Sequence, residues 1–329
     1  MCKVSVIIPV YQETSRLERT LAGFCMQSFR DFEVIIVNDG GSIENDAIVK
    51  NYETELNILY MKQNNLGRAA ARQKGLKHVS GKYVLYNDAD RIPSSTMIQK
   101  HVEVLDQDET AITIGEKREV IFEYDENLNI PPYKLAEVLK KQPESREKIL
   151  ESTENELVSA QQLKERLDEI LEEWDLGCSS DNHFEIFERY GNELKGFQLP
   201  WGIATTANMA YCREKYPKVQ FDTNYVGWGM EDTDFAYQLY LEGGHFIYLP
   251  DAKNYHQLHK VTFGIWGQLY SNGRYFCYKY PCIETYIFYS VIRAVVGLEE
   301  ASILIEHIKN NSNEINDSLE KLCKYIALY

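Results

Sequence analysis

The sequence of 329 residues predicts an α/β protein with a mostly parallel sheet that is covered by helices on both faces. The first observation is a pair of nearly continuous β-branched runs, at 4–10 and 34–37, which are typical of strands buried on both faces. The second is the helical spacing of apolar residues between these runs, so that strands and helices alternate. The third is a polar segment at the end of each early strand. We therefore expect these segments to converge at one edge of the sheet.

The first strand, 4–10, closes near Pro9, because proline cannot donate a hydrogen bond to a neighbouring strand. Thr14 is the expected N-cap of the helix that follows, whose apolar residues recur three and four positions apart. The second strand ends at Asp39, just before a glycine-rich turn. Asp39 either caps its own loop as an Asx-turn or, buried at the sheet edge, accepts the imide hydrogen of a nucleobase.

A third strand, at 58–61, precedes an alanine-rich helix start that carries Arg72. Helix N-termini and arginines both suit phosphates, so this segment is a candidate nucleotide-binding element. The next β-prone run ends in Asp88, Ala89 and Asp90. If the chain stays extended through Ala89, both carboxylates face one side and can hold one Mg²⁺ or Mn²⁺ ion. A solvated loop after the strand is the simpler alternative.

The middle and the end of the chain are expected to add helices to this sheet. Residues 94–105 predict a helix, and 111–114 and 118–122 predict two further strands. Between 131 and 174 the sequence becomes charge-dense, with apolar residues on one helical stripe, namely Leu157, Leu163, Leu167, Ile170, Leu171 and Trp174. We interpret this segment as a helical insertion. Beyond residue 260 the pattern predicts a helical extension, with helices at 286–296, 303–308 and 319–328.

The composition excludes several classes of partner. Fifty acidic and 35 basic residues give a formal charge of −15, which disfavours nonspecific binding to nucleic acid or anionic lipid. The seven cysteines are scattered and predict reduced thiols, and the N-terminus lacks the features of a signal peptide. The apolar segment 286–298 is shorter than the about 20 residues that cross a bilayer. We expect a cytoplasmic protein with no nucleic-acid partner and at most peripheral membrane contact.

Two later segments carry candidate chemistry. A loop rich in glycine leads into a helix that begins with Glu231 and Asp232, next to Trp228. Acidic residues complement the dipole of a helix start, so capping alone is one explanation, and acid–base chemistry is the other. A strand at 245–249 leads to His256 and His259. Either imidazole, in its neutral form, can complete the shell of a cation, and an ordinary pair of surface histidines is the alternative.

Four segments, in this order, resemble family 2 glycosyltransferases: Val-Ser-Val-Ile-Ile-Pro-Val-Tyr, Val-Asn-Asp-Gly-Gly-Ser, Asn-Leu-Gly-Arg-Ala-Ala-Ala-Arg and Asp-Ala-Asp. The resemblance implies a GT-A fold that binds a nucleotide sugar. It assigns a nucleotide-sugar site to Pro9, Tyr11, Glu13, Asp39, Arg72, Asp88 and Ala89. In that assignment the loop of Tyr11 and Glu13, with Asp39, surrounds uracil. Arg72 lies against the nucleotide, Asp88 faces the ribose, and Asp90 binds the metal.

The segment Trp-Gly-Met-Glu-Asp resembles the acceptor-side motif of β1,4-galactosyltransferases and bacterial chondroitin-type synthases. The resemblance makes Asp232 the general base and Trp228 an acceptor-binding residue, and we expect Trp201 near the acceptor sugars as well. Met230 replaces a glycine of the galactosyltransferases, so Glu231 stays the alternative base. His256 lies between tyrosine and glutamine, as in chondroitin-type synthases, and is therefore preferred to His259 as the metal ligand.

The expected activity is a Mn²⁺- or Mg²⁺-dependent, inverting transfer of a sugar from a UDP-sugar to a glycan, lipid-linked or peptide acceptor. The Gln-x-x-Arg-Trp motif of processive synthases is absent, which favours single additions. The expected transferase domain covers 1–265, with a nucleotide-sugar half at 1–100 and an acceptor half at 101–265. The latter contains the insertion at about 131–175, and the extension covers 266–329. A sugar nucleotidyltransferase and a catalytically silent carbohydrate- or partner-binding protein are the alternatives.

Overall fold

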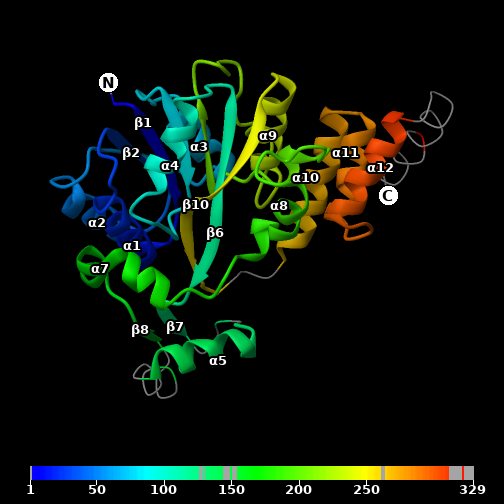
Figure 1. Ribbon diagram of the computed structural model, residues 1–329. Helices are drawn as coiled ribbons and strands as arrows, with labels where there is room; N and C mark the ends of the chain where they lie inside the picture. Colours follow the sequence, from blue (N-terminus) through cyan, green and yellow to red (C-terminus); the bar gives the residue numbers. More distant parts are fainter. Residues whose placement is uncertain are drawn as a thin grey trace.

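The computed structural model describes residues 2–125, 128, 130–143, 149, 154–260, 264–310 and 321. An eight-stranded sheet forms its centre, with the strand order β3-β2-β1-β4-β9-β6-β10-β5 (Figure 1). The strands are β1 (Val4–Val10), β2 (Phe32–Asp39), β3 (Ile58–Gln63), β4 (Tyr83–Asn87), β5 (Arg91–Pro93), β6 (Ala111–Val120), β9 (Asn208–Cys212) and β10 (His245–Gln257). The α/β class expected from the sequence is confirmed.

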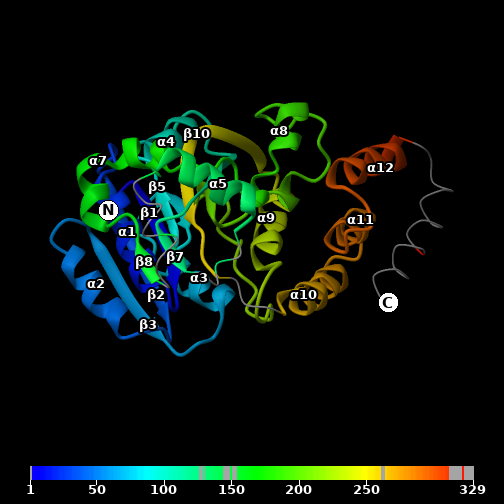
Figure 2. The ribbon, with the colours of Figure 1, turned by 90° about the horizontal axis from the view of Figure 1, so that it is seen from below.

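The direction of the strands decides where the polar loops meet. β1, β2, β3 and β4 are parallel neighbours, and β6 is parallel to β10. β9 is antiparallel to both β4 and β6, so the two parallel groups run the same way. The carboxyl ends of six strands therefore lie at one edge of the sheet, which is the edge seen from below in Figure 2. This is where open α/β sheets bind ligands.

Helices cover both faces of the sheet, because the strand side chains alternate between two apolar clusters. Ile8 belongs to the cluster under α1 (Thr14–Cys25), α2 (Glu44–Tyr52), α4 (Met97–Leu105) and α7 (Ala160–Glu173). Its neighbour Ile7 belongs to the cluster under α3 (Arg68–Leu76), α8 (Phe184–Tyr190) and α9 (Glu231–Leu241). Both isoleucines are fully buried, as expected for a strand with two covered faces.

Two local predictions were wrong. Helix α1 begins at Thr14, but its N-cap is Glu13, which makes no capping hydrogen bond to the helix. The segment 111–114 and residues 118–120 of the second segment belong to one strand, β6, because pairing with β10 continues beyond Gly115. Gly115 fits here because β10 bulges opposite it, and a β-carbon at Gly115 would lie 2.3 Å from the carbonyl oxygen of Ala252.

The insertion follows β6 and lies at the carboxyl edge of the sheet (Figures 1 and 2). It consists of the antiparallel pair β7 (Glu123–Asp125) and β8 (Glu154–Glu156), helix α5 (Pro132–Lys141) and helix α7. The apolar stripe predicted from the sequence, from Leu157 to Trp174, is buried in the cluster that contains α1. The insertion is therefore anchored on α1 by apolar packing.

Three helices extend the fold beyond β10, namely α10 (Ile265–Lys279), α11 (Ile283–Ile292) and α12 (Leu298–Asn310). They stack one on the next, and α10 lies beside α9 in both views (Figures 1 and 2). The helix expected at 319–328 lies outside the described residues apart from position 321. Across the described ranges, no helix combines the length and apolar character that a membrane span needs.

Candidate active site

Three side chains with metal-binding chemistry converge at the carboxyl edge of the sheet. Asp90 follows β4, His256 lies near the end of β10, and His259 comes just after that strand. Their potential ligand atoms all lie within 4.8 Å of one another. The Oδ2 atom of Asp90 is 3.0 Å from Nε2 of His259 and 3.5 Å from Nε2 of His256. The sequence left the two histidines as alternatives, and the structure brings both to the same carboxylate.

The carboxylate and the imidazoles of this cluster shift one another's pKa values. Burial alone raises the pKa of Asp90, but the adjacent imidazoles outweigh it and hold that pKa well below its ordinary value. Burial lowers the pKa of His259, and the hydrogen bond and charge of Asp90 more than offset this, so the pKa is raised. One carboxylate and two imidazoles are a donor set that suits divalent transition metals, Mn²⁺ included. The three residues therefore fit a divalent cation.

The cluster depends on a turn that the sequence did not predict. The Asn87 side chain donates hydrogen bonds to the carbonyl oxygens of Asp88 and Arg91, both at 2.8 Å. These bonds fold the chain immediately after β4, so it does not stay extended through Ala89. The expectation that Asp88 and Asp90 face one side and share a cation was wrong for this reason. Asp90 faces the histidines, and Asp88 faces an arginine.

That arginine, Arg72, joins the two halves of the site. Its Nη2 atom lies 2.9 Å from Oδ1 of Asp88, and its Nη1 atom lies 2.9 Å from Oε1 of Glu231. The side chains of Arg72 and Glu231 are 4% and 5% exposed, so this ion pair is largely desolvated. The second oxygen of Glu231 is buried and accepts no hydrogen bond from the described part of the chain. The loop after β4, which carries Asp88, and the start of α9 are thereby held together.

Asp232 occupies the first turn of α9 beside this pair and is partly exposed. Its Oδ1 atom accepts a hydrogen bond from the backbone N–H of Thr233 at 2.8 Å. Burial, followed by repulsion from Glu231, raises the pKa of Asp232 to about 6, although Arg72 acts in the opposite direction. A carboxylate with this pKa is a stronger base than an ordinary aspartate. Glu231 is occupied by Arg72, so Asp232 is the better placed of the two.

The loop before α9 is clamped by α10. Gly227, Gly229 and Met230 all have positive φ angles, which fold the loop tightly around the partly exposed Trp228. The Nδ2 atom of Asn272 donates to the carbonyl oxygens of the loop at 226, 228 and 229, at 3.1, 3.3 and 2.9 Å. The side chain of Gln268, also on α10, accepts a hydrogen bond from the loop, from the backbone N–H of Trp228 at 2.8 Å.

Sequence reasoning missed both clamping residues. Asn272 lies on the buried face of α10, between Leu269 and Phe276, and is itself only 7% exposed. An amide on an apolar helix face was the available signal, because a buried polar group needs partners. Gln268 is one turn earlier on the same helix and carries no comparable signal. The C-terminal extension therefore contributes directly to the shape of the loop before α9.

The expected nucleotide side is a set of interlocked loops after β1, β2 and β3. Both oxygens of Asp39 accept hydrogen bonds, from the side chain of Gln63 and from the backbone N–H groups of Leu66 and Gly67, at 2.8 to 2.9 Å. Tyr11 is 39% exposed beside this loop. Asp39 thus orders the start of α3, as a loop-capping carboxylate does, while remaining at the sheet edge where the sequence put it.

The remaining residues of this side are placed as follows. Glu13 accepts hydrogen bonds from the backbone N–H groups of Tyr11 and Gln12, both at 2.8 Å, and so shapes the loop after β1. Pro9 is partly buried, and Ala89 is buried. A cavity of about 230 Å³ lies alongside, lined by Asn38, Gly40, Gly41, Ser42, Ile43, Asp46, Lys62 and Gln63.

Trp201 does not lie at a surface that an acceptor can reach. It sits in a short 3₁₀ helix, η3 (Pro200–Gly202), and is fully buried. Its ring packs against the rings of Tyr237, Phe276 and Phe288, with centroids 4.7 to 5.6 Å away. The expectation that Trp201 contacts acceptor sugars is corrected on this ground. It is a core residue that holds α9 against the C-terminal helices.

The chain is similar in sequence to known glycosyltransferases. A model described as "Glycosyl transferase family 2" matches residues 5–175, which include strands β2 to β6 and Asp90. The chain is 28% identical over 258 residues to chondroitin synthase from Escherichia coli, an alignment that covers 77% of this chain. The chain spans only 34% of the length of that synthase.

Two solved structures share the fold. Residues 1–349 of TarS from S. aureus, in complex with UDP-GlcNAc, match 88% of this chain and 71% of that chain, with a TM-score of 0.54 and 15% identity. The mannosyltransferase PcManGT from Pyrobaculum calidifontis, in complex with GDP-Man and Mn²⁺, matches 100% of this chain and 81% of that chain, with a TM-score of 0.51 and 15% identity. The GT-A fold expected from the sequence is confirmed.

Proposed function

The chain belongs to glycosyl transferase family 2, and on that premise we propose that it moves a sugar from a UDP-sugar to a hydroxyl group of an acceptor, using a divalent cation. The convergence of Asp90, His256 and His259 within 4.8 Å carries the proposal. A group of this composition at the carboxyl edge of an α/β sheet suits a cation that meets a nucleotide diphosphate. Once bound, that cation stabilises the negative charge of the departing diphosphate.

The donor is assigned to the loops around Tyr11 and Asp39, with the diphosphate directed to the cation cluster. The solved relatives with UDP-GlcNAc or GDP-Man support a nucleotide-sugar donor in general. A uridine donor rests on the motif resemblance at Asp39. Two imidazoles among three ligands favour Mn²⁺ over Mg²⁺, because magnesium prefers oxygen ligands.

Asp232 is the general base of the proposed reaction, and Trp228 packs against the acceptor. Asp232 takes the proton of the acceptor hydroxyl, whose oxygen attacks the anomeric carbon as the bond to the diphosphate breaks. Attack from the face opposite the leaving group inverts the anomeric configuration. Glu231 holds Arg72, and through it Asp88, so its role is to position the site. The acceptor is a glycan, a lipid-linked saccharide or a peptide side chain, and addition is expected to be single.

The test begins with ligand binding. Nucleotide sugars are screened for a rise in the unfolding temperature of the protein that occurs only with Mn²⁺ present, because a bound ligand stabilises the folded state by mass action. A UDP-sugar is expected to give the largest rise. The best donor is then combined with acceptor candidates of the three classes, and released UDP and the glycosylated product are measured.

Two variants separate the assigned roles. Asp90→Ala is expected to lose the Mn²⁺-dependent rise, whereas Asp232→Asn is expected to keep donor binding and lose transfer. Donor binding without turnover with any acceptor would instead support a silent binding protein. Release of pyrophosphate from UTP and a sugar phosphate would support a nucleotidyltransferase. Full transfer by Asp232→Asn would contradict the proposed base.

A further inference from the structure

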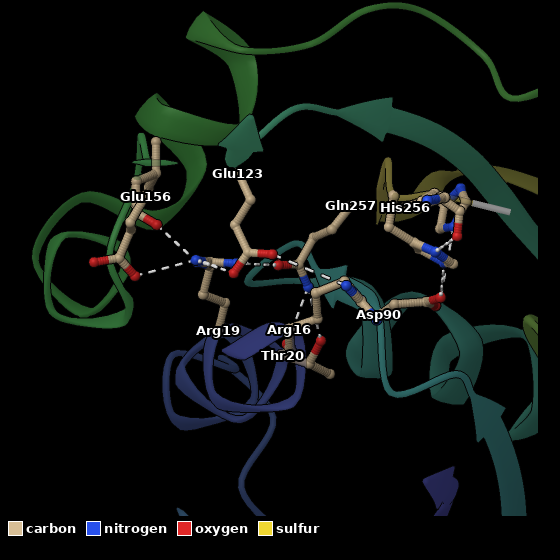
Figure 3. Close-up of polar contacts among 11 residues, drawn as sticks. Arg16, Arg19, Thr20, Asp90, Glu123, Glu156, His256 and Gln257 are labelled. Atoms are coloured by element: carbon tan, nitrogen blue, oxygen red, sulfur yellow. Dashed lines mark hydrogen bonds and ion pairs between the residues drawn. The ribbon is translucent and has the colours of Figure 1, made fainter. Parts of the chain in front are cut away.

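Helix α1 carries a buried arginine, Arg19, and Gln257 lies between it and the cluster of Asp90 and His256 (Figure 3). Arg19 is 1% exposed, and its guanidinium donates four hydrogen bonds, to the carbonyl oxygen of Val158 and the side chains of Gln257, Glu123 and Glu156, at 2.7 to 3.1 Å. A buried charge requires such partners, because its desolvation is costly when it is unpaired. Glu123 and Glu156 belong to β7 and β8, an antiparallel pair with helix α5 between its strands in the chain.

Gln257 extends this network from Arg19 to the cluster. Its Nε2 atom donates to the carbonyl oxygen of Arg16 at 3.0 Å and to the hydroxyl of Thr20 at 3.3 Å. Its backbone N–H donates to the carbonyl oxygen of Asp90 at 2.9 Å. Gln257 also directly follows His256 in β10. Gln257 thus joins α1, through its side chain, to the backbone of Asp90, through its own backbone N–H.

The same turn of α1 makes a second contact with the loop that bears Asp90. The hydroxyl of Thr20 donates to the carbonyl oxygen of Ala89 at 2.9 Å, one residue before the carboxylate. Thr20 is fully buried and Gln257 is 2% exposed, so water cannot replace these partners. The position of Asp90 is therefore fixed from α1 through Ala89 and from β10 through the backbone of Gln257.

We propose that Arg19 and Gln257 are positioning residues for the cation site, with Arg19 acting through the side chain of Gln257. The inference rests on the proposed function, because it takes Asp90 and His256 as ligands. Partners of metal ligands matter in this way because they hold the ligand atoms in place, and their loss typically weakens metal binding about 10- to 100-fold.

The competing explanation is that Arg19 only holds the β7–β8 pair against α1 and has no effect on the cluster. The exposed fractions of the partner side chains of Arg19 distinguish this explanation from the proposed positioning role. The side chains of Glu123 and Glu156 are 32% and 56% exposed, so water can solvate them once Arg19 is gone. Gln257 has no such access, and its Oε1 atom would be left without its donor in the interior. Loss of Arg19 therefore leaves an unsatisfied buried polar atom at Gln257, next to the cluster.

The experiment measures Mn²⁺ affinity of the full chain by the electron paramagnetic resonance signal of unbound Mn²⁺, at a temperature where every variant is folded. Arg19→Met and Gln257→Leu are each expected to weaken Mn²⁺ binding about tenfold or more. The loss of Mn²⁺ affinity in the double variant is expected to be smaller than the product of the two single losses, because both residues act through one network. Lys279→Met is the matched control. It breaks an ion pair with the buried Asp234 and has no contact with the cluster among its hydrogen bonds.

The outcomes distinguish this inference from the proposed function. Arg19→Met and Gln257→Leu variants that bind Mn²⁺ as tightly as the unaltered protein, while Asp90→Asn does not bind it, would overturn the inference alone. Equal weakening by Lys279→Met would also overturn it, because general destabilisation would then explain the effect. If Arg19→Met does not fold, the Mn²⁺ affinity of Gln257→Leu alone tests the inference. Failure of the unaltered protein to bind Mn²⁺ would overturn the cation site itself, and the inference with it.

Discussion

The acidic limb of the pH–rate profile tests the role of Asp232. An ordinary aspartate has a pKa of about 3.9, whereas burial and the charge of Glu231 raise the pKa of Asp232 to about 6. A base acts in its deprotonated form, so activity must fall as the pH drops through this pKa. A group with a pKa of about 6 is about 90% deprotonated at pH 7 and about 10% at pH 5. We therefore expect kcat/KM to fall roughly tenfold between pH 7 and pH 5.

Glu231→Gln tests the cause of the raised pKa. The change removes a negative charge that raises the pKa of Asp232 and keeps Arg72, which lowers it. The pKa of Asp232 must then fall, and the acidic limb must move to lower pH. His256 and His259 are the same in both proteins. The displacement between the two profiles therefore reports on Asp232 and not on loss of the cation at low pH.

The assay follows UDP release with the donor and acceptor found by screening, between pH 5 and pH 8, at constant ionic strength and with saturating Mn²⁺ at each pH. An ordinary pKa of about 3.9 would give a loss of less than about 10% by pH 5, which is readily distinguished from a tenfold loss. Superimposable profiles for the unaltered protein and Glu231→Gln, or a shift to higher pH, would refute the reasoning about Asp232.

Three further substitutions have expected outcomes. In Gly41→Ala the new β-carbon would lie 1.3 Å from the carbonyl oxygen of Tyr11, so the loops after β1 and β2 must separate. Calorimetry should show weaker UDP binding, with Gly267→Ala, where a β-carbon meets nothing within 4 Å, as the unaffected control. Asn272→Ala should lower kcat and leave the donor Kd unchanged, since it frees only the acceptor-side loop. Trp201→Ala should lower the free energy of unfolding in urea by about 3–5 kcal/mol.

The sheet was predictable from the sequence because its strands are buried on both faces. The strand β1 was predicted with its observed bounds, 4–10, and β2 and β3 were placed correctly although shorter than observed. Continuous apolar runs leave little choice, since a surface loop would expose them to water. The single strand β6 was divided in two because Gly115 interrupts its β-branched pattern. That glycine is needed because β10 bulges opposite it, and β10 lies more than a hundred residues later in the chain. The sequence around Gly115 therefore does not reveal why the strand continues.

The site was predictable as a set of residues and less so as a geometry. Asp88 and Asp90 were correctly placed at a strand end, but their shared face assumed an extended chain. The turn that separates them depends on Asn87, whose side chain is itself held by a hydrogen bond from Asn254 at 2.9 Å. A contact across 167 positions cannot be read from local spacing. The environment of Trp201 was likewise not predictable from local sequence. A tryptophan near a motif can contact a sugar at the surface or pack in the core, and the sequence does not distinguish the two.

Arg72 shows why residue type and not only charge matters in this site. The sequence suggested a partner for phosphate, but in the structure its two terminal nitrogens hold two different carboxylates, Asp88 and Glu231, each at 2.9 Å. A lysine ends in one nitrogen on a flexible stem and cannot hold two separated acids in a fixed geometry. Without the arginine, Glu231 would be an unpaired buried charge beside Asp232, and burying an unpaired charge is costly. The fork of Arg72 therefore holds the carboxylate of Glu231 beside Asp232, and the charge of Glu231 raises the pKa of Asp232, the proposed base.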